Sequence, residues 1–150
     1  MIKIDSVEDL DVFKRSHQLT LNVYKMATAL PADEKFGLVA QMKRAAASIC
    51  TNLMEGSYRL NRGEYRQFVG IARGSSGELK YHLLLARDLG YISENDYSRY
   101  RVESDEISKM LKGLAKSLSA PKVRSGSSLL ALALTQPLTL TLTLTLALLK

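Results

Sequence analysis

Four segments of the sequence carry apolar residues at intervals of three or four positions, and this spacing constrains the fold more than any other feature. The clearest stripe consists of Leu38, Met42, Ala45, Ile49 and Leu53. Because an α-helix turns once in about 3.6 residues, these positions share one face of an amphipathic helix. No segment before residue 120 alternates at period two for long enough to predict a sheet.

A first helix is predicted upstream of Pro31. Ser6, with Asp9 three residues later, resembles a capping box in which Asp replaces the usual Glu. Apolar residues then recur at Leu10, Phe13, Leu21, Tyr24 and Ala27 or Thr28. The helix is expected to stop at Leu30, because proline disfavours the helical conformation in the preceding residue. Residues 31–34 follow as a short turn that could itself be helical.

Two more helices follow the stripe at residues 38–53, whose helix should end near Gly56. A long helix is predicted over residues 62–89, with Asn61 as N-cap and Gly90 as C-terminal glycine. Its apolar positions are Tyr65, Phe68, Ala72, Leu79, Leu83 and Ala86. The last helix begins after Ser93, runs to residue 120 and carries Tyr100, Ile107, Leu111, Leu114 and Leu118. Short links between these helices predict an all-α, antiparallel up-down four-helix bundle over residues 1–120.

Three glycines lie inside the third predicted helix, at Gly70, Gly74 and Gly77. Each glycine destabilises a helix by about 0.5–1 kcal/mol relative to alanine. We therefore expect another backbone to approach the helix closely there. The alternative is a helix that bends locally.

Residues 121–150 differ in kind from the rest of the chain. They contain the linker-like run Ser-Gly-Ser-Ser at residues 125–128 and the repeat LTLTLTLTL at residues 138–146. We expect a poorly ordered extension that is prone to aggregate. An added strand or interface segment and a membrane anchor are the alternatives, but Gln136 and Pro137 interrupt the apolar run and a membrane partner is not expected.

The cysteine and charge content point to an ordinary cytoplasmic protein. Cys50 is the single cysteine, so no intrachain disulfide can form, and no cleavable signal-like segment begins the sequence. Cys50 lies among apolar helical residues and is expected to be a small buried hydrophobe. The net charge of +6 falls to +3 for residues 1–120, which hold 18 Lys and Arg against 15 Asp and Glu. Bulk charge is therefore weak evidence for nucleic-acid binding.

No catalytic or metal-binding constellation can be assembled from the sequence. Glu78 and His82 lie four residues apart on one predicted helix, but a di-iron bundle needs a Glu-x-x-His pair from each of two helices. Ser-His-Asp groupings, phosphate-binding glycine loops and Cys/His clusters are also missing from the sequence. We therefore predict no enzymatic activity, no metal and no cofactor.

The basic residues are arranged more informatively. Five of them fall within roughly 60° of one another on the third predicted helix, displaced from its apolar face by a little under a right angle: Arg62, Arg66, Arg73, Lys80 and Arg87. Lys43, Arg44 and Arg59 are candidates to extend this ridge from the second helix and the loop after it. Such a ridge could neutralise phosphates, or it could be a solvated, salt-bridged face.

Two tyrosines lie near this basic stretch. Tyr58 and Tyr65 could stack on bases, although Tyr65 also fits the apolar face.

Four stretches together carry a family resemblance. They are KRSHQLTLNVYK at 14–25, QMKRAAASICTNLMEG at 41–56, EYRQFVGIARGSSGELKYHL at 64–83 and ARDLGYI at 86–92. In order and spacing they resemble the bacterial four helix bundle proteins encoded in intervening sequences of 23S rRNA genes, with relatives that are accessory proteins of diversity-generating retroelements. The resemblance covers residues 5–119.

The resemblance implies an antiparallel four-helix protomer that forms a ring-like homopentamer with a positively charged surface and no enzymatic activity. For the retroelement relatives it also implies contacts with nucleic acid and a reverse transcriptase. This chain departs from the family in two places. Cys50 replaces the usual proline, which removes a potential kink, and residues after Pro121 have no family counterpart.

The leading hypothesis is a non-catalytic, self-assembling adaptor for nucleic acid, with structured RNA as the expected ligand. The candidate phosphate contacts are Lys43, Arg44, Arg59, Arg62, Arg66 and Arg73. The competing hypothesis is a structural protein-interaction module in which the arginines pair with acids of a neighbouring subunit.

Overall fold

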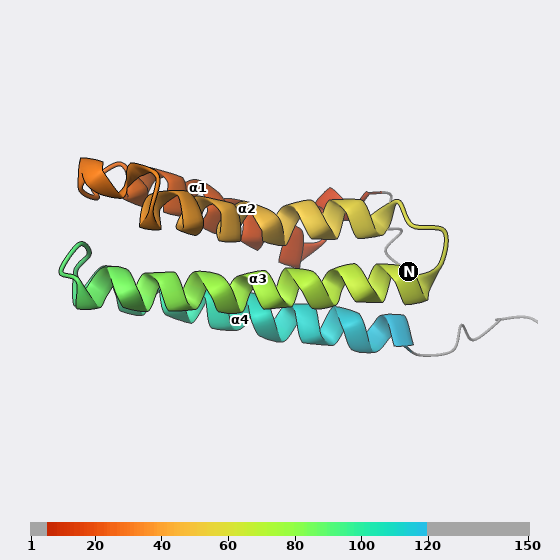
Figure 1. Ribbon diagram of the computed structural model, residues 1–150. Coiled ribbons are helices and arrows are strands. Elements are labelled where there is room, and N and C mark those ends of the chain that lie inside the picture. The colour runs from red at the N-terminus through yellow and green to blue at the C-terminus, as the bar shows by residue number, and fades with distance from the viewer. Residues whose placement is uncertain (1–5, 120–150) are drawn as a thin grey trace, which may run out of the picture. The chain divides into compact units, whose positions relative to one another are not determined.

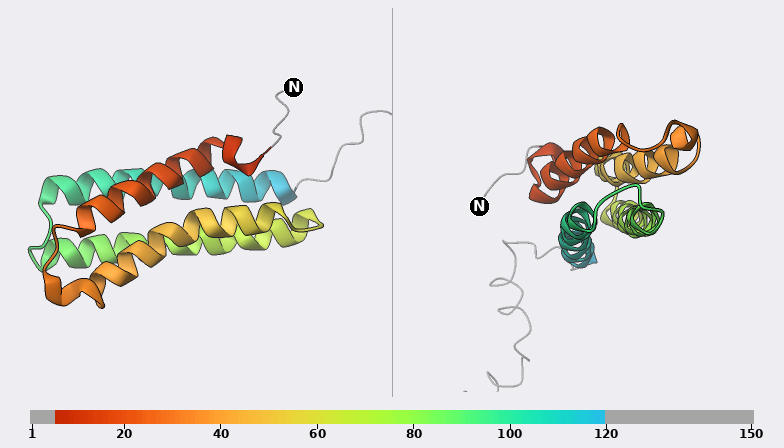
Figure 2. Two further views of the ribbon diagram at one scale, coloured as in Figure 1. Left: turned by 90° about the horizontal axis from the view of Figure 1, so that it is seen from above. Right: turned by 90° about the vertical axis from the view of Figure 1, so that its left-hand side faces the viewer.

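The computed structural model describes residues 6–119, and within them the chain forms four antiparallel helices (Figure 1). These are α1 (Asp11–Ala27), α2 (Leu38–Ser57), α3 (Arg62–Asp88) and α4 (Glu94–Ser119). Short 3-10 helices η1 (Val7–Asp9) and η2 (Ala32–Lys35) precede α1 and α2. The α1–α2 and α3–α4 hairpins form two layers (Figure 2). The predicted four-helix bundle is confirmed, whereas the interpretations of the tail fall outside the described residues.

The core forms where the apolar stripes of the four helices meet. On α2 every predicted stripe position is buried, and α3 and α4 bury Ala72, Leu79, Ile107 and Leu111 completely. Leu114 and Leu118 of α4 pack against this core and are only partly buried. The 3.6-residue spacing therefore predicted the inward faces of these three helices correctly.

The predicted inward face of α1 is only partly correct: Ala27 is buried and Leu10 and Phe13 pack against the core, but Leu21 and Tyr24 do not. The buried positions are Val12, Ser16, Leu19, Val23 and Ala27, while Leu21 is 50% exposed and Tyr24 is 45% exposed. Ser16 interrupts the buried stripe, so the apolar spacing of this face is not continuous in the sequence. The Ser16 hydroxyl donates to the Val12 carbonyl at 2.7 Å, so it is buried with its hydrogen bond made. A second apolar stripe on α1 consequently faces outward.

Capping residues fix the helix ends close to the predicted positions. The Ser6 and Asp9 capping box forms, but it caps η1 and not α1. At the other end of α1 the chain tightens into a turn, in which the Leu30 amide bonds to Ala27 O at 3.4 Å, so α1 ends before Leu30. Asn61 accepts from the Glu64 amide at 2.9 Å and starts α3, and Gly90 follows α3 with a φ of 75°.

The glycines of α3 do not mark a close approach inside the protomer. A Cβ atom at Gly70, Gly74 or Gly77 would meet no atom within 4 Å, and α3 is one continuous helix. The close approach lies instead at Gly56 of α2, where a Cβ would be 2.6 Å from Cδ2 of Tyr65. Glycine at position 56 therefore lets α2 and α3 pack together.

Cys50 does not interrupt α2, which runs through it unbroken. The thiol is partly buried beside Phe13, and burial raises its pKa to about 11 despite a hydrogen bond with Thr20. Cys50 was predicted to be a small buried hydrophobe, and the structure shows it only partly buried.

No helix within residues 6–119 combines the length and the apolar character needed to cross a membrane.

Candidate nucleic-acid interface

The predicted cationic ridge lies along the edge of α3 that borders α4. Near its middle, Lys80 Nζ lies 2.7 Å from Asp105 Oδ1 of α4. At the start of α3, Arg62 Nη2 donates to the Ser117 carbonyl of α4. Since these two contacts bracket Arg66 and Arg73 on the same side of α3, both of these arginines border α4 as well.

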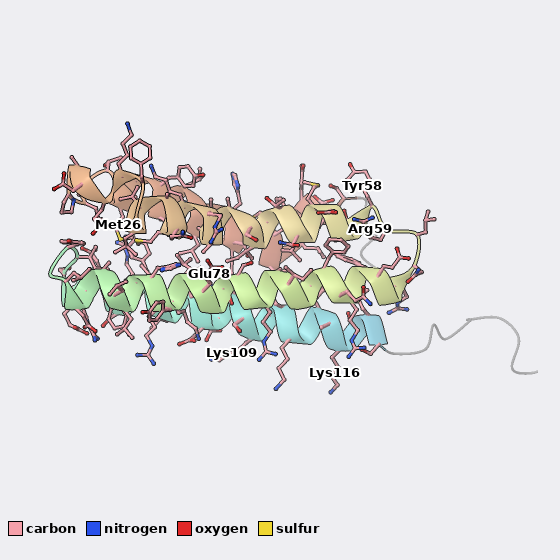
Figure 3. The ribbon with its side chains drawn as sticks, in the orientation of Figure 1. Met26, Tyr58, Arg59, Glu78, Lys109 and Lys116 are labelled. Carbon is pink, nitrogen blue, oxygen red and sulfur yellow. The ribbon has the colours of Figure 1, made fainter. Side chains whose placement is uncertain are left out.

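A second row of cations lies on the facing edge of α4, and sequence reasoning missed it. Lys109, Lys112 and Lys116 follow Asp105 at steps of four, three and four residues, so they share its side of the helix. Lys109 and Lys116 project from α4 on the side away from α1 and α2 (Figure 3). The two rows together form a surface that we call the basic strip: Arg62, Arg66 and Arg73 of α3 and Lys109, Lys112 and Lys116 of α4.

Most of the charge on the basic strip is available. Lys109 pairs with Glu106 at 2.7 Å, and this hydrogen bond raises the pKa of Lys109 and lowers the pKa of Glu106. Among residues 6–119, no carboxylate forms an ion pair with Arg66, Arg73, Lys112 or Lys116, which are all exposed. The positive charge of these side chains is therefore exposed to an approaching anion.

The ridge is neutralised beyond Arg73. The hydrogen bond from Lys80 lowers the pKa of Asp105. Arg87 lies 2.7 Å from Asp88, and its guanidinium stacks 4.3 Å from the ring centroid of Tyr97. The C-terminal half of the predicted ridge is thus a salt-bridged face, while its N-terminal half remains open.

The other three predicted contacts lie elsewhere in the bundle. Arg44 pairs with Glu78 at 3.1 Å, and Glu78 lies about 160° around α3 from Arg62 at 100° per residue. Arg59 pairs with Glu55 and stacks 4.5 Å from the ring centroid of Phe68.

Lys43 lies over the ring of Tyr24, with 5.2 Å from Nζ to the centroid. The structure therefore brings Arg62, Arg66 and Arg73 together and separates Lys43, Arg44 and Arg59 from them. Their charges are already engaged by a carboxylate or an aromatic ring.

The tyrosines considered for base stacking also lie off the strip. Tyr58 is 81% exposed in the α2–α3 turn. Tyr65 packs against the core, and its hydroxyl is buried without a partner, so burial raises its pKa.

The described residues show no group of three His, Cys, Asp or Glu side chains that could hold a metal ion. His82 Nε2 lies 3.5 Å from Glu78 Oε1, and this contact is an ion pair only when the imidazole is protonated. Both ring nitrogens are otherwise buried without a hydrogen bond. This pair is an isolated i,i+4 contact.

Residues 8–113 match a family model described as "23S rRNA-intervening sequence protein". The chain belongs to this family. The match includes the helices that carry the basic strip, except the last residues of α4. The family resemblance carried by the four sequence stretches is thereby confirmed.

A solved structure with the same fold supports this membership. It is a protein of unknown function from the S23 ribosomal protein family of Bacteroides thetaiotaomicron, with 25% sequence identity and a TM-score of 0.66. The match covers 70% of this chain and 95% of that chain. The comparison with curated proteins gives no match.

Proposed function

We propose that this member of the family is a non-catalytic, self-assembling adaptor that binds RNA. The basic strip supports the proposal, because two neighbouring helices present cations of which only Lys109 is paired with a described acid. Phosphates that bind Lys and Arg release condensed counterions, which favours association.

Self-assembly is supported by apolar side chains that the protomer leaves uncovered. Leu21 and Tyr24, which are 50% and 45% exposed, lie on the outward stripe of α1. Exposed apolar groups of this kind are typical of protein interfaces. A cyclic assembly, a homopentamer by the family resemblance, would repeat the basic strip around the ring and enlarge its field.

An adaptor of this kind would work in the cytoplasm and would hold RNA for a partner protein. A reverse transcriptase is the partner implied for the retroelement relatives. Phosphate contacts position a ligand without reading its sequence, so specificity would come from that partner or from RNA shape.

The test is RNA affinity as a function of salt. For the wild type, the logarithm of the association constant should fall steeply with the logarithm of the salt concentration. The Arg62→Glu, Arg66→Glu, Arg73→Glu variant should bind RNA at least tenfold more weakly, and the magnitude of this slope should decrease by about two to three. A variant with the same change in charge away from the strip, Lys14→Glu, Lys25→Glu, Lys35→Glu, is the control. A flat wild-type plot, or equal losses in both variants, would remove the proposal.

The uncovered apolar stripe of α1 also favours a second candidate, a purely structural protein-interaction module. In that case the arginines of the strip would pair with acids of a neighbouring subunit. A structure of the assembly with Arg66 and Arg73 buried against Glu or Asp would favour this function over RNA binding.

A further inference from the structure

We infer that the basic strip binds double-helical RNA and not a single strand. This inference rests on the proposed function and deepens it by naming the form of the ligand. The reasons are the two-row layout of the cations, the lack of aromatic groups among them and the bare helix surface beside the arginines.

The strip is broad as well as long. Arg62 and Arg73 are eleven residues apart, or about 16 Å along α3 at 1.5 Å per residue. The second row on α4 lies one helix away, at an interaxial distance of about 8–10 Å for packed helices. A duplex presents two phosphate backbones side by side to such a surface, whereas a single strand offers only one.

Aromatic side chains are not part of the strip. Proteins that bind single strands combine a basic groove with aromatic rings on which successive bases stack. In the part of the chain that the structure describes, the aromatics that are more than 40% exposed lie outside the six residues of the strip, on α1, before α2, in the α2–α3 turn and, four residues after Gly77, on α3: Tyr24, Phe36, Tyr58 and Tyr81. The strip thus offers phosphate contacts without stacking partners.

The surface of α3 next to the arginines carries no side chains at three positions. Gly70 follows Arg66 by four residues, and Gly74 and Gly77 follow Arg73 by one and four. Folding does not require these glycines, because a Cβ at each would meet nothing within 4 Å and the helix would gain stability from alanine. A rigid duplex can therefore lie against the helix backbone while the flanking arginines reach its phosphates.

The experiment uses the full chain, a blunt 20-base-pair RNA duplex and each of its single strands, with affinity measured by fluorescence anisotropy at several salt concentrations. The duplex is expected to bind at least tenfold more tightly than either strand. The Gly70→Gln, Gly74→Gln, Gly77→Gln variant should bind the duplex at least tenfold more weakly and keep or raise its melting temperature. The corresponding alanine variant is the matched control, since it also stabilises the helix but adds only methyl groups.

Two results would overturn the inference: a single strand that binds as tightly as the duplex, or a glutamine variant whose duplex affinity is unchanged, whether its assembly mass in light scattering stays the same or changes. A change of mass in that case would assign the glycines to subunit contact. Absence of binding to either form of RNA would instead refute the proposed function itself.

Discussion

Lys80 and Asp105 join α3 to α4 at 2.7 Å, and this pair divides the cationic edge of α3 into two parts. On the N-terminal side, Arg66 and Arg73 have no acid partner among the described residues, whereas on the C-terminal side Arg87 is paired with Asp88. Asp105 therefore neutralises Lys80 and Asp88 neutralises Arg87, which leaves the arginines before Lys80 available to a ligand.

The Lys80–Asp105 pair should stabilise the bundle modestly and only above acidic pH. The folded state lowers the pKa of Asp105, so its contribution is present above the unfolded carboxyl pKa and is lost as the pH falls through the folded value. Both side chains are more than 30% exposed, which limits the coupling to about 0.2–1 kcal/mol. A double-mutant cycle with Lys80→Ala and Asp105→Ala in urea should find this coupling at pH 7 and none at pH 2. Equal coupling at both pH values would contradict the assignment.

Alanine should have opposite effects at two glycines. Gly56→Ala would place Cβ 2.6 Å from Tyr65 and 2.7 Å from Phe68, and overpacking of this kind costs about 1–3 kcal/mol. Gly70→Ala meets open space and should stabilise the bundle by about 0.5–1 kcal/mol. Thermal melts of the two variants measure both effects, and a stable Gly56→Ala variant would show that α2 and α3 do not approach as described.

Leu19 and Leu21 should respond very differently to truncation although they are two residues apart. Leu19 is 1% exposed and belongs to the core, so Leu19→Ala should lower the free energy of unfolding by about 2–5 kcal/mol. Leu21 is half exposed, and Leu21→Ala should change it by less than about 0.5 kcal/mol. Chemical denaturation gives both values. Similar losses in the free energy of unfolding would show that Leu21 is also buried, as the sequence predicted.

Cys50 should react slowly with alkylating reagents while the protein is folded. Burial raises the pKa of its thiol from 9.0 to about 11, so at pH 8 its thiolate fraction is about 100-fold below that of the unfolded chain. Because the folded state retains the thiol proton to higher pH than the unfolded chain, the free energy of unfolding should decrease as the pH rises from 9 to 11. Iodoacetamide labelling with and without urea measures the alkylation rate of Cys50 in the unfolded and the folded chain. Comparable rates in the two states would contradict the prediction.

The four helices could be predicted from the sequence because each one buries a row of apolar residues that extends over several turns. The sequence pattern misplaced Leu21 and Tyr24 of α1, where Ser16 occupies a buried position and donates its hydroxyl hydrogen bond to the Val12 carbonyl. Local spacing could not distinguish that stripe from the outward one, which is equally apolar.

Sequence reasoning named only part of the candidate site. Arg62, Arg66 and Arg73 could be grouped from one helix, because helical geometry fixes their relative directions. Lys112 and Lys116 join them only through the register of α3 against α4, which no local pattern reveals. Arg44 and Arg59 were grouped with them because the side of α2 that meets α3 and the path of the α2–α3 turn were unknown.

Packing constrains Gly56, whereas only a ligand would constrain Gly70, Gly74 and Gly77. A descendant that keeps the packing of α2 on α3 has no alternative to glycine at position 56, because the space is filled by Tyr65 and Phe68. Drift at Gly70, Gly74 and Gly77 carries no such penalty and would even strengthen the helix. Homologues that have lost the ligand should therefore still have the first glycine but accumulate larger residues at the other three.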